Sequence, residues 1–313
     1  MPQRRWMWIA AFLTALTMCA VTACVSGRPE RVPHSPDTSP PVSAPVLVAK
    51  IDNSPQGRPP VGLAPADLVY VEPVEGGLSR LAAVFSTHKP PVIGPVRSAR
   101  ETDLTLLDQF GNPTLASSGA APELTPAVDG APLHNASAER RPAAYYRDHG
   151  RDAPHNMLVR PDELPVGGTW PPASQPHFGP APAGGQPTQH EQARYQDAVI
   201  GFDWSPSRHG WLVSMDGAPY TEADTGQLMA STVVLQRVQV ADSAVSDVAG
   251  SVSPLVQTTG SGRALVLRDG HAFPAEWSRP SPVAGTTYTA PTGTAIPFAP
   301  GQVWTVLVPA QLW

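Results

Sequence analysis

The sequence predicts an α+β protein, with a mixed α/β N-terminal domain followed by a smaller, mainly antiparallel β C-terminal domain. Its 313 residues, 41% of them hydrophobic, can bury the core of one large domain or two small ones. Short runs rich in β-branched and aromatic residues recur between turn signals, which indicates many strands. A stretch rich in proline and glycine at 165–190 predicts a linker between a domain at 46–164 and one at 191–313.

The start of the chain predicts export and lipid anchoring. Arg4 and Arg5 precede an apolar run and then small residues, the pattern of a secretory signal peptide over 1–23. The run ends in "VTAC", which resembles a bacterial lipobox, so we expect a diacylglycerol thioether on Cys24. The alternative is an ordinary signal peptide that is cleaved nearby. The polar, proline-rich residues 24–45 predict a tether that lifts the folded part off an extracytoplasmic membrane surface.

Composition excludes several classes of function. Cys19 and Cys24 are the only cysteines, so the body of the protein has no disulfide, thiol nucleophile or cysteine metal ligand. A net charge of -5 argues against binding to nucleic acid. We find no P-loop, dinucleotide fingerprint, hydrolase nucleophile motif or zinc-binding spacing, and therefore expect no cofactor and no metal. The expected partners are the membrane, through the lipid, and a cell-wall ligand or an envelope protein.

The N-terminal half begins with three predicted strands, at 46–52, 68–74 and 78–86. The Gly76–Gly77 pair between the last two permits a tight turn with positive φ.

A helix is predicted from about Ala99 to Phe110. Ser98 and Glu101 have the spacing of a capping box, and Gly111 is a natural stop. Leu104 and Leu107 supply the apolar stripe of this helix.

The C-terminal half predicts a series of short strands, separated by turn signals, at 198–204, 210–217, 231–240, 262–270, 271–279 and 303–309. Trp277 and Trp304 lie within these strands, so we expect both in the core.

Several unusual strings occur in order along the chain: "IDNSPQGRPPVGLAPADLVYVEPVEGGLSRLAAVF", "IGPVRSAR", "YYRDHGRDAPHNMLV", "DGAPYTEADTG", "GSGRALVLRDGHAFPAEWSRP" and "PGQVWTVLVP". With them the sequence resembles the YerB-like bacterial lipoproteins, which carry an uncharacterised two-part domain. The resemblance implies the two-part fold and a place on the cell membrane, and no established activity. The sequence departs from the family pattern at Tyr220, where the family often has histidine, and at Thr232, where the family often has asparagine.

Two groups of charged residues are candidates for a site. Arg97 and Arg100 flank the start of the predicted helix, where guanidinium groups and unpaired N–H groups favour a carboxylate or phosphate. The alternative is an internal ion pair with Glu72 or Glu75. Glu75, beside the glycine turn with Arg80 nearby, can also act as a general base or bind a ligand hydroxyl.

The segment "YYRDHGRDAPHN" at 145–156 is the densest cluster of functional side chains. Aromatic rings with arginine, aspartate and asparagine suit a sugar-like ligand, and the alternative is a loop whose charged groups hold its own turns. Two histidines and an aspartate there make a metal site conceivable, but their spacing matches no zinc pattern.

Taken together, these features predict an envelope protein that binds an anionic or carbohydrate-like ligand, or a partner protein, in a polar cleft of the N-terminal domain. The predicted lining is Glu75, Arg80, Arg97, Arg100, Arg147, Asp148, His155 and Asn156. One alternative is a hydrolase or transferase of wall material with Glu75 and His155 as acid and base, and another is a structural or assembly lipoprotein.

Overall fold

The structure is a computed structural model that describes residues 44–246 and 250–313. The predicted signal peptide, Cys24 and nearly all of the predicted tether lie outside the described residues. No helix in the described part of the chain is long and apolar enough to cross a membrane.

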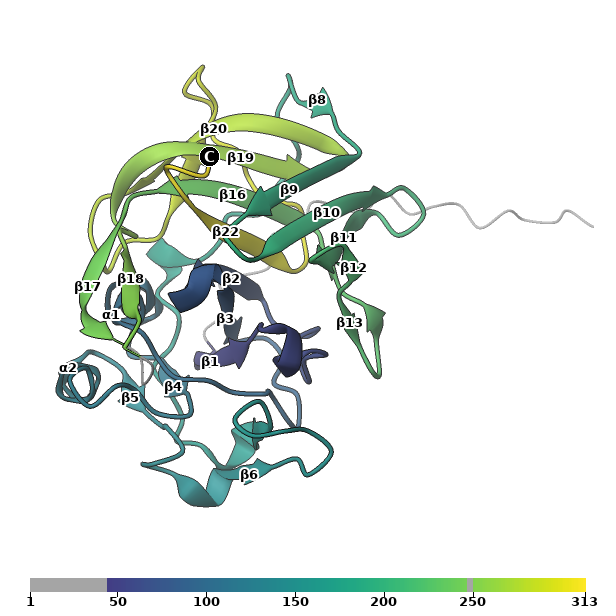
Figure 1. The fold of residues 1–313 in the computed structure, drawn as a ribbon. Coiled ribbons are helices and arrows are strands. Elements are labelled where there is room, and N and C mark those ends of the chain that lie inside the picture. The colour runs from purple at the N-terminus through teal and green to yellow at the C-terminus, as the bar shows by residue number, and fades with distance from the viewer. Residues whose placement is uncertain (1–43, 247–249) are drawn as a thin grey trace, which may run out of the picture. The chain divides into compact units, whose positions relative to one another are not determined.

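One large mixed sheet organises the fold (Figure 1). In order across the sheet, its strands are Thr287–Thr289 (β21), His271–Arg279 (β20), Gly260–Arg268 (β19), Thr232–Val238 (β16), Val303–Pro309 (β22), Leu68–Pro73 (β2), Ser79–Phe85 (β3), Leu47–Asp52 (β1), Thr114–Ala116 (β4) and His134–Asn135 (β5), with Gln186–Pro187 (β8) beside β20. β22 lies parallel to both β16 and β2, and β4 lies parallel to β1 and β5. The remaining neighbours are antiparallel, so both halves of the sequence contribute to one sheet.

Smaller sheets pack around the large one. Their strands are His190–Arg194 (β9), Val199–Ser205 (β10), Gly210–Met215 (β11), Ala218–Pro219 (β12) and Met229–Ala230 (β15), then Thr221–Glu222 (β13) with Gly226–Gln227 (β14), Val240–Ser246 (β17) with Val252–Val256 (β18), and Tyr145–Arg147 (β6) with Met157–Val159 (β7). The α-helices are Glu101–Leu106 (α1) and Thr125–Gly130 (α2), and the 3-10 helices are Pro55–Gly57 (η1), Glu75–Gly77 (η2), Leu107–Phe110 (η3), Pro142–Ala144 (η4), Pro161–Glu163 (η5) and Pro172–Ser174 (η6).

Both faces of the large sheet are covered by apolar groups. Side chains alternate along β2, with Val69 and Val71 in one hydrophobic cluster and Leu68 and Tyr70 in another. The first cluster includes side chains of β10 and β11, and the second includes side chains of α1, η3 and the β17–β18 hairpin. Burial on both faces explains why the central strands read as nearly continuous apolar runs.

The predicted strands of both halves are confirmed, and so is the glycine turn, because Gly76 and Gly77 have φ values of 68° and 66°. Trp277 and Trp304 are buried in the core as expected. The predicted helical content was too high, because strands dominate the described residues and each α-helix has only six residues. Helices this short depend on packing rather than on their own propensity. The division into two domains and a linker stays a prediction.

The predicted cap of the helix was wrong. The α-helix begins after Arg100, whose backbone N–H donates to the Asp103 carboxylate at 2.6 Å. Ser98 lies outside the helix, with its hydroxyl 3.3 Å from that of Ser118. Glu101 lies three residues after Ser98 and Asp103 lies three residues after Arg100, so either pair could form a capping box. Glu101 instead accepts a hydrogen bond from Ser243 of β17, and Asp103 caps the helix at Arg100. Gly111 ends the helical segment in the left-handed conformation, as predicted.

Candidate functional site

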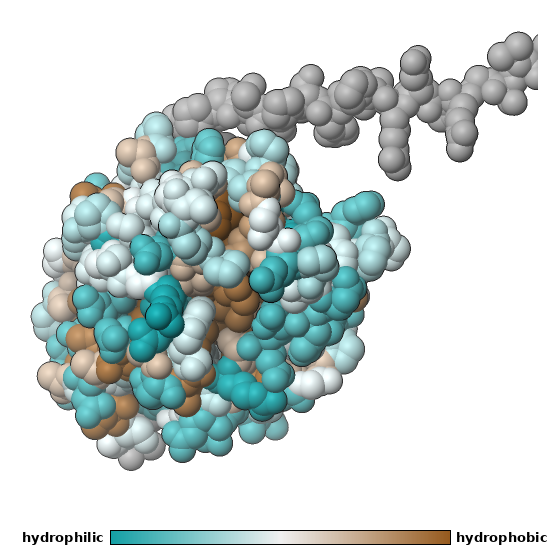
Figure 2. Space-filling model, turned by 90° about the horizontal axis from the view of Figure 1, so that it is seen from above, coloured by the Kyte–Doolittle hydropathy of each residue, from teal (hydrophilic) through white to brown (hydrophobic). Residues whose placement is uncertain are grey.

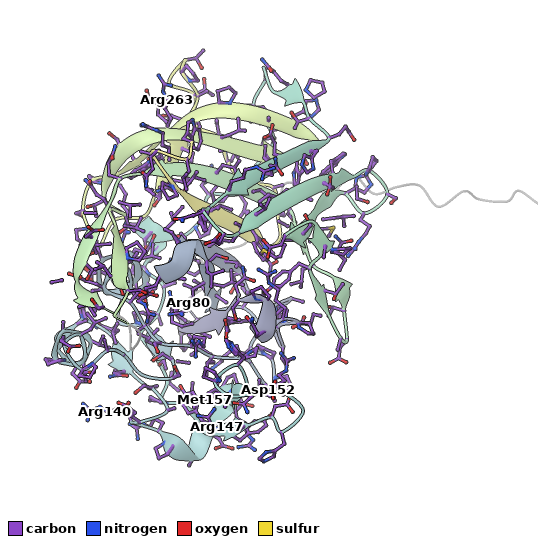
Figure 3. All side chains as sticks on the ribbon, in the orientation of Figure 1. Arg80, Arg140, Arg147, Asp152, Met157 and Arg263 are labelled. Atoms are coloured by element: carbon purple, nitrogen blue, oxygen red, sulfur yellow. The ribbon has the colours of Figure 1, made fainter. Side chains whose placement is uncertain are left out.

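Charged side chains line up across the edge of β2, β3 and β1. Arg80 of β3 lies opposite Asp52 of β1 on one side and Glu72 of β2 on the other. Directly opposed residues share a face of a sheet, so these three side chains form a row. Figure 3 shows Arg80 on β3, with Arg147, Asp152 and Met157 of the β6–β7 hairpin below it in this view.

Asp52 is the centre of this row, although it was not among the predicted site residues. Its carboxylate accepts from the backbone N–H and the hydroxyl of Ser54 at 3.0 and 2.8 Å, and lies 2.7 Å from Nδ1 of His155. Nε of Arg97 lies 3.5 Å from the same oxygen that His155 contacts. Burial raises the pKa of Asp52, but the bonds from Ser54 and His155 and the charge of Arg97 outweigh burial and lower it.

The ionised Asp52 sets the orientation of His155. A carboxylate only accepts, so Nδ1 of the ring carries the proton and Nε2 lies on the opposite side. Ser54 contacts that same Nδ1 at 3.2 Å, with its hydroxyl donating to Asp52. The three residues are therefore not a Ser-His-Asp triad, which requires serine and aspartate on opposite ring nitrogens.

Glu75 and Arg100 form the predicted internal ion pair. The Arg100 guanidinium donates to both carboxylate oxygens of Glu75, at 2.7 and 2.8 Å, and Ser253 of β18 donates to one of them. Burial raises the pKa of Glu75, but the bonds from Arg100 and Ser253 overcome this effect and lower it to about 2. Glu75 is therefore ionised at neutral pH with both carboxylate oxygens accepting hydrogen bonds, and it is poorly suited to carry a proton.

Arg80 and Arg97 remain underpaired. Arg80 is only 7% exposed, and its one hydrogen bond goes to the carbonyl of Ser98 at 3.1 Å. Among the described residues, no carboxylate oxygen lies within 4.0 Å of its guanidinium. Burial, together with the charges of Arg100 and Arg97, lowers the pKa of Arg80 to about 10. Arg97, whose side chain is 26% exposed, has a buried Nε without a hydrogen bond.

A second charged group lies deeper, and sequence reasoning missed it. Lys50 is fully buried and donates to Glu72 at 2.5 Å and to Asp103 at 2.7 Å. Burial raises the pKa of Glu72 to about 7, against the opposing effect of Lys50. Because the group holds two carboxylates and one cation, it offers no site for a further anion. The alternation of Lys50 and Asp52 within an apolar strand was the available signal.

The remaining predicted residues hold their own loop. Arg147 donates to the side chain of Asn156 at 2.6 Å, and Asn156 donates to the carbonyl of Arg151 at 3.1 Å. Asp148 accepts from the backbone of Gly150 at 2.9 Å and lies 3.3 Å from Nε of Arg151. The structure thus brings Glu75, Arg80, Arg97, Arg100 and His155 to the row around Asp52, and it uses Arg147, Asp148 and Asn156 to shape the loop that carries His155.

Neither position at which the sequence departs from the family pattern offers a site. Tyr220 is buried with its ring edge-on to Trp304, and Thr232 accepts a backbone hydrogen bond from Ala299 at 2.9 Å. The described residues contain no group of three or more histidine, cysteine, aspartate or glutamate side chains able to hold a metal.

Two hollows of about 220 and 330 Å³ are lined by other residues, the larger by rings of Tyr70, Tyr288 and Phe298. Figure 2 shows one face of the molecule, where an apolar strip lies in a depression between hydrophilic surfaces. The charged row is not part of either hollow, so its access to solvent comes from the partial exposure of Arg97 and His155.

Comparison with known proteins shows similarity over both halves of the chain. The family model described as "Protein of unknown function (DUF3048) N-terminal domain" matches residues 34–167, and the corresponding C-terminal domain matches residues 192–305. The putative lipoprotein YerB of Bacillus subtilis (strain 168) is 23% identical over 279 residues, covering 85% of this chain and 81% of that protein. The crystal structure of the Bacillus subtilis YerB protein matches with a TM-score of 0.72 at 19% identity, covering 85% of this chain and 91% of the other.

Proposed function

The chain belongs to the DUF3048 family, and from that premise we propose that it is a lipid-anchored protein of the bacterial cell envelope that binds an anionic ligand at Arg80 and Arg97. The anchor is the lipid on Cys24, and the folded part faces the extracytoplasmic side. The leader with its "VTAC" end supports this placement, as does the name of the Bacillus relative, a putative lipoprotein.

One observation carries the ligand proposal, namely that the guanidinium groups of Arg80 and Arg97 donate no hydrogen bond to a carboxylate among the described residues. Arg80 lies opposite Glu72, which is bonded to Lys50, and Arg97 lies 3.5 Å from Asp52, which is bonded to Ser54 and His155. A bound anion would supply the close, hydrogen-bonded partner that both arginines lack. Carboxylate and phosphate groups both match the planar donor array of arginine.

Titration calorimetry of the purified chain with acidic wall fragments tests the site. Arg97→Gln removes one guanidinium without disturbing the Glu75–Arg100 pair and should weaken binding about ten-fold or more. Arg160→Gln is the matched control, because Arg160 is exposed and lies over the ring of Tyr146. Equal affinities of the wild type and Arg97→Gln would remove Arg97 from the site, and absence of binding by the wild type would leave a structural or assembly role.

The anchor is tested separately. Mass spectrometry of the N-terminal peptide from membranes should find Cys24 carrying diacylglycerol, and a Cys24→Ala chain should leave the membrane fraction. Recovery of Cys24→Ala in membranes in the same proportion as wild type would contradict the lipid anchor.

An envelope hydrolase or transferase remains a second candidate, favoured only by the orientation of His155 by Asp52. The pairing of Glu75 with Arg100 opposes the version in which Glu75 and His155 act as acid and base, because Glu75 has no proton to give at neutral pH and its low pKa makes it a weak base. Release of soluble products from purified wall material by wild type, and not by His155→Gln, would support this candidate.

A further inference from the structure

We infer that the anion taken by this site is a phosphoryl group with an ionisable oxygen, free or in monoester linkage, held by Arg80, Arg97 and Nε2 of His155. This inference rests on the proposed function and narrows its ligand to one chemical class.

The three groups lie side by side. His155 and Arg97 meet the same oxygen of Asp52, at 2.7 and 3.5 Å, so they are neighbours. Arg80 lies beside them, since it is the cross-strand partner of Asp52 and donates to the carbonyl next to Arg97. The donors come from β3, from the segment before α1 and from the loop after β6, and so they approach from three parts of the chain.

These groups also have unused hydrogen-bonding capacity. Arg80 contacts no carboxylate among the described residues, and the Nη groups of Arg97 make no hydrogen bond there, whereas its buried Nε faces Asp52 at 3.5 Å. No polar group in the described part of the chain contacts Nε2 of His155, whereas Nδ1 is fully engaged by Asp52 and Ser54. The side chains of Arg97 and His155 are 26% and 20% exposed, so a small solute can reach them.

Charged groups face His155 from each element around it. Asp52 of β1 and Arg97 of the segment before α1 lie against the ring, and Arg80 of β3 lies behind them. On the loop of His155 itself, the backbone carbonyl of Asp152 accepts the N–H of His155, and Arg151 is directed to the carbonyl of Gly57 and to Asp148. Glu72 of β2 lies on the far side of Arg80 and is bonded to Lys50, so an added anion would be the close partner that Arg80 and Arg97 lack.

The charge and the number of free oxygens determine which anion fits best. With Nδ1–H donated to Asp52, Nε2 of a protonated ring can donate to a bound anion of any kind. Carboxylates and phosphate diesters carry one charge near neutral pH, whereas a phosphate monoester carries up to two and offers three terminal oxygens. Arg80, Arg97 and His155 approach from three parts of the chain, so they match a phosphoryl group better than a singly charged anion.

Calorimetry on the full chain tests the inference. Sodium phosphate, glycerol 3-phosphate, dimethyl phosphate and acetate are titrated at pH 7 in two buffers that differ in ionisation enthalpy. We expect phosphate and glycerol 3-phosphate to bind about ten-fold more tightly than the other two, with proton uptake that reports contact of the bound anion with the ring of His155. His155→Gln should abolish the proton uptake and reduce phosphate affinity about ten-fold, and Arg160→Gln should match wild type.

The outcomes separate the two proposals. Equal affinity for all four anions would overturn the phosphoryl inference and leave the anion site in place. No binding of any anion would overturn both. If His155→Gln unfolds, the proton uptake of the wild type and a phosphate-dependent shift of the His155 ring signals by NMR decide the question. Vesicles with and without phosphatidic acid then distinguish a lipid headgroup from a soluble phosphate.

Discussion

The Glu75–Arg100 pair makes a quantitative prediction about stability. Arg100→Ala removes both guanidinium bonds to a carboxylate that is 9% exposed, leaving Ser253 as its remaining side-chain donor. The pKa of Glu75 lies at about 2 in the folded protein against an ordinary 4.5. At about 1.4 kcal/mol for each pKa unit, this difference corresponds to about 3.5 kcal/mol, to which Ser253 also contributes, so the share of Arg100 is about 3 kcal/mol, in the range for breaking a buried ion pair.

The dependence on pH has a defined sign. The folded pKa of Glu75 is depressed, so the stabilisation is complete above pH 4.5 and is lost as the pH falls towards 2. In urea unfolding of the whole chain, Arg100→Ala should lose about 3 kcal/mol at pH 7 and progressively less below pH 4.5.

Two further variants make the test specific. Combining Arg100→Ala with Glu75→Gln should restore part of the loss at pH 7, because the buried charge is then absent. Arg160→Ala, which removes an exposed arginine 3.7 Å from Glu163, should change stability by less than about 1 kcal/mol. A loss below about 1 kcal/mol for Arg100→Ala at pH 7, or the same loss at every pH, would refute this reasoning.

Three other predictions concern buried groups and their packing. Burial raises the pKa of Glu72 to about 7, so its contribution to stability is complete below pH 4.5 and lost as the pH rises to 7, and Glu72→Gln should flatten that part of a urea-measured stability profile. Arg279 donates to the last carbonyls of α1 from a fully buried position, and Arg279→Ala should lower stability by about 3 kcal/mol, measured by thermal unfolding. A Cβ on Gly57 would lie 2.5 Å from Cγ of Asp52, so Gly57→Ala should displace that carboxylate and weaken anion binding in calorimetry about ten-fold.

Each of these has a contrary result. An unchanged profile between pH 4.5 and 7 in Glu72→Gln would mean that Glu72 is ionised throughout. A loss under about 1 kcal/mol in Arg279→Ala would mean that water satisfies the carbonyls. Wild-type affinity in Gly57→Ala would separate Asp52 from the ligand site.

Local features of the site were predictable from sequence. The Gly76–Gly77 turn and the stop at Gly111 depend on backbone conformations that glycine adopts without steric cost, and both were predicted. The sequence allowed Arg97 or Arg100 to pair with Glu72 or Glu75, and in the structure the pair is Glu75 with Arg100.

The centre of the site was not predictable in the same way. Asp52 ends a strand whose other polar residue is Lys50, and the neighbouring residues do not indicate that it meets His155 and Arg97. It acquires its partners from residues up to 103 positions away, when β1 and β3 pair and the loop of His155 closes over them.

The sequence by itself determines the features that depend on short-range chemistry, which are the positions of the strands, the glycine turns and the family pattern, and it predicts the leader that ends at Cys24. The tertiary structure alone decides that β2 and β22 lie side by side in parallel and that Arg100 makes a two-bond pair with Glu75, while Arg80 and Arg97 donate no hydrogen bond to a carboxylate among the described residues. The physical reason is that local propensities act over a few residues, whereas charge pairing is determined by which strands meet. The sequence allows either Glu72 or Glu75 to pair with either Arg97 or Arg100. The partners are decided only when the fold buries one carboxylate beside one arginine.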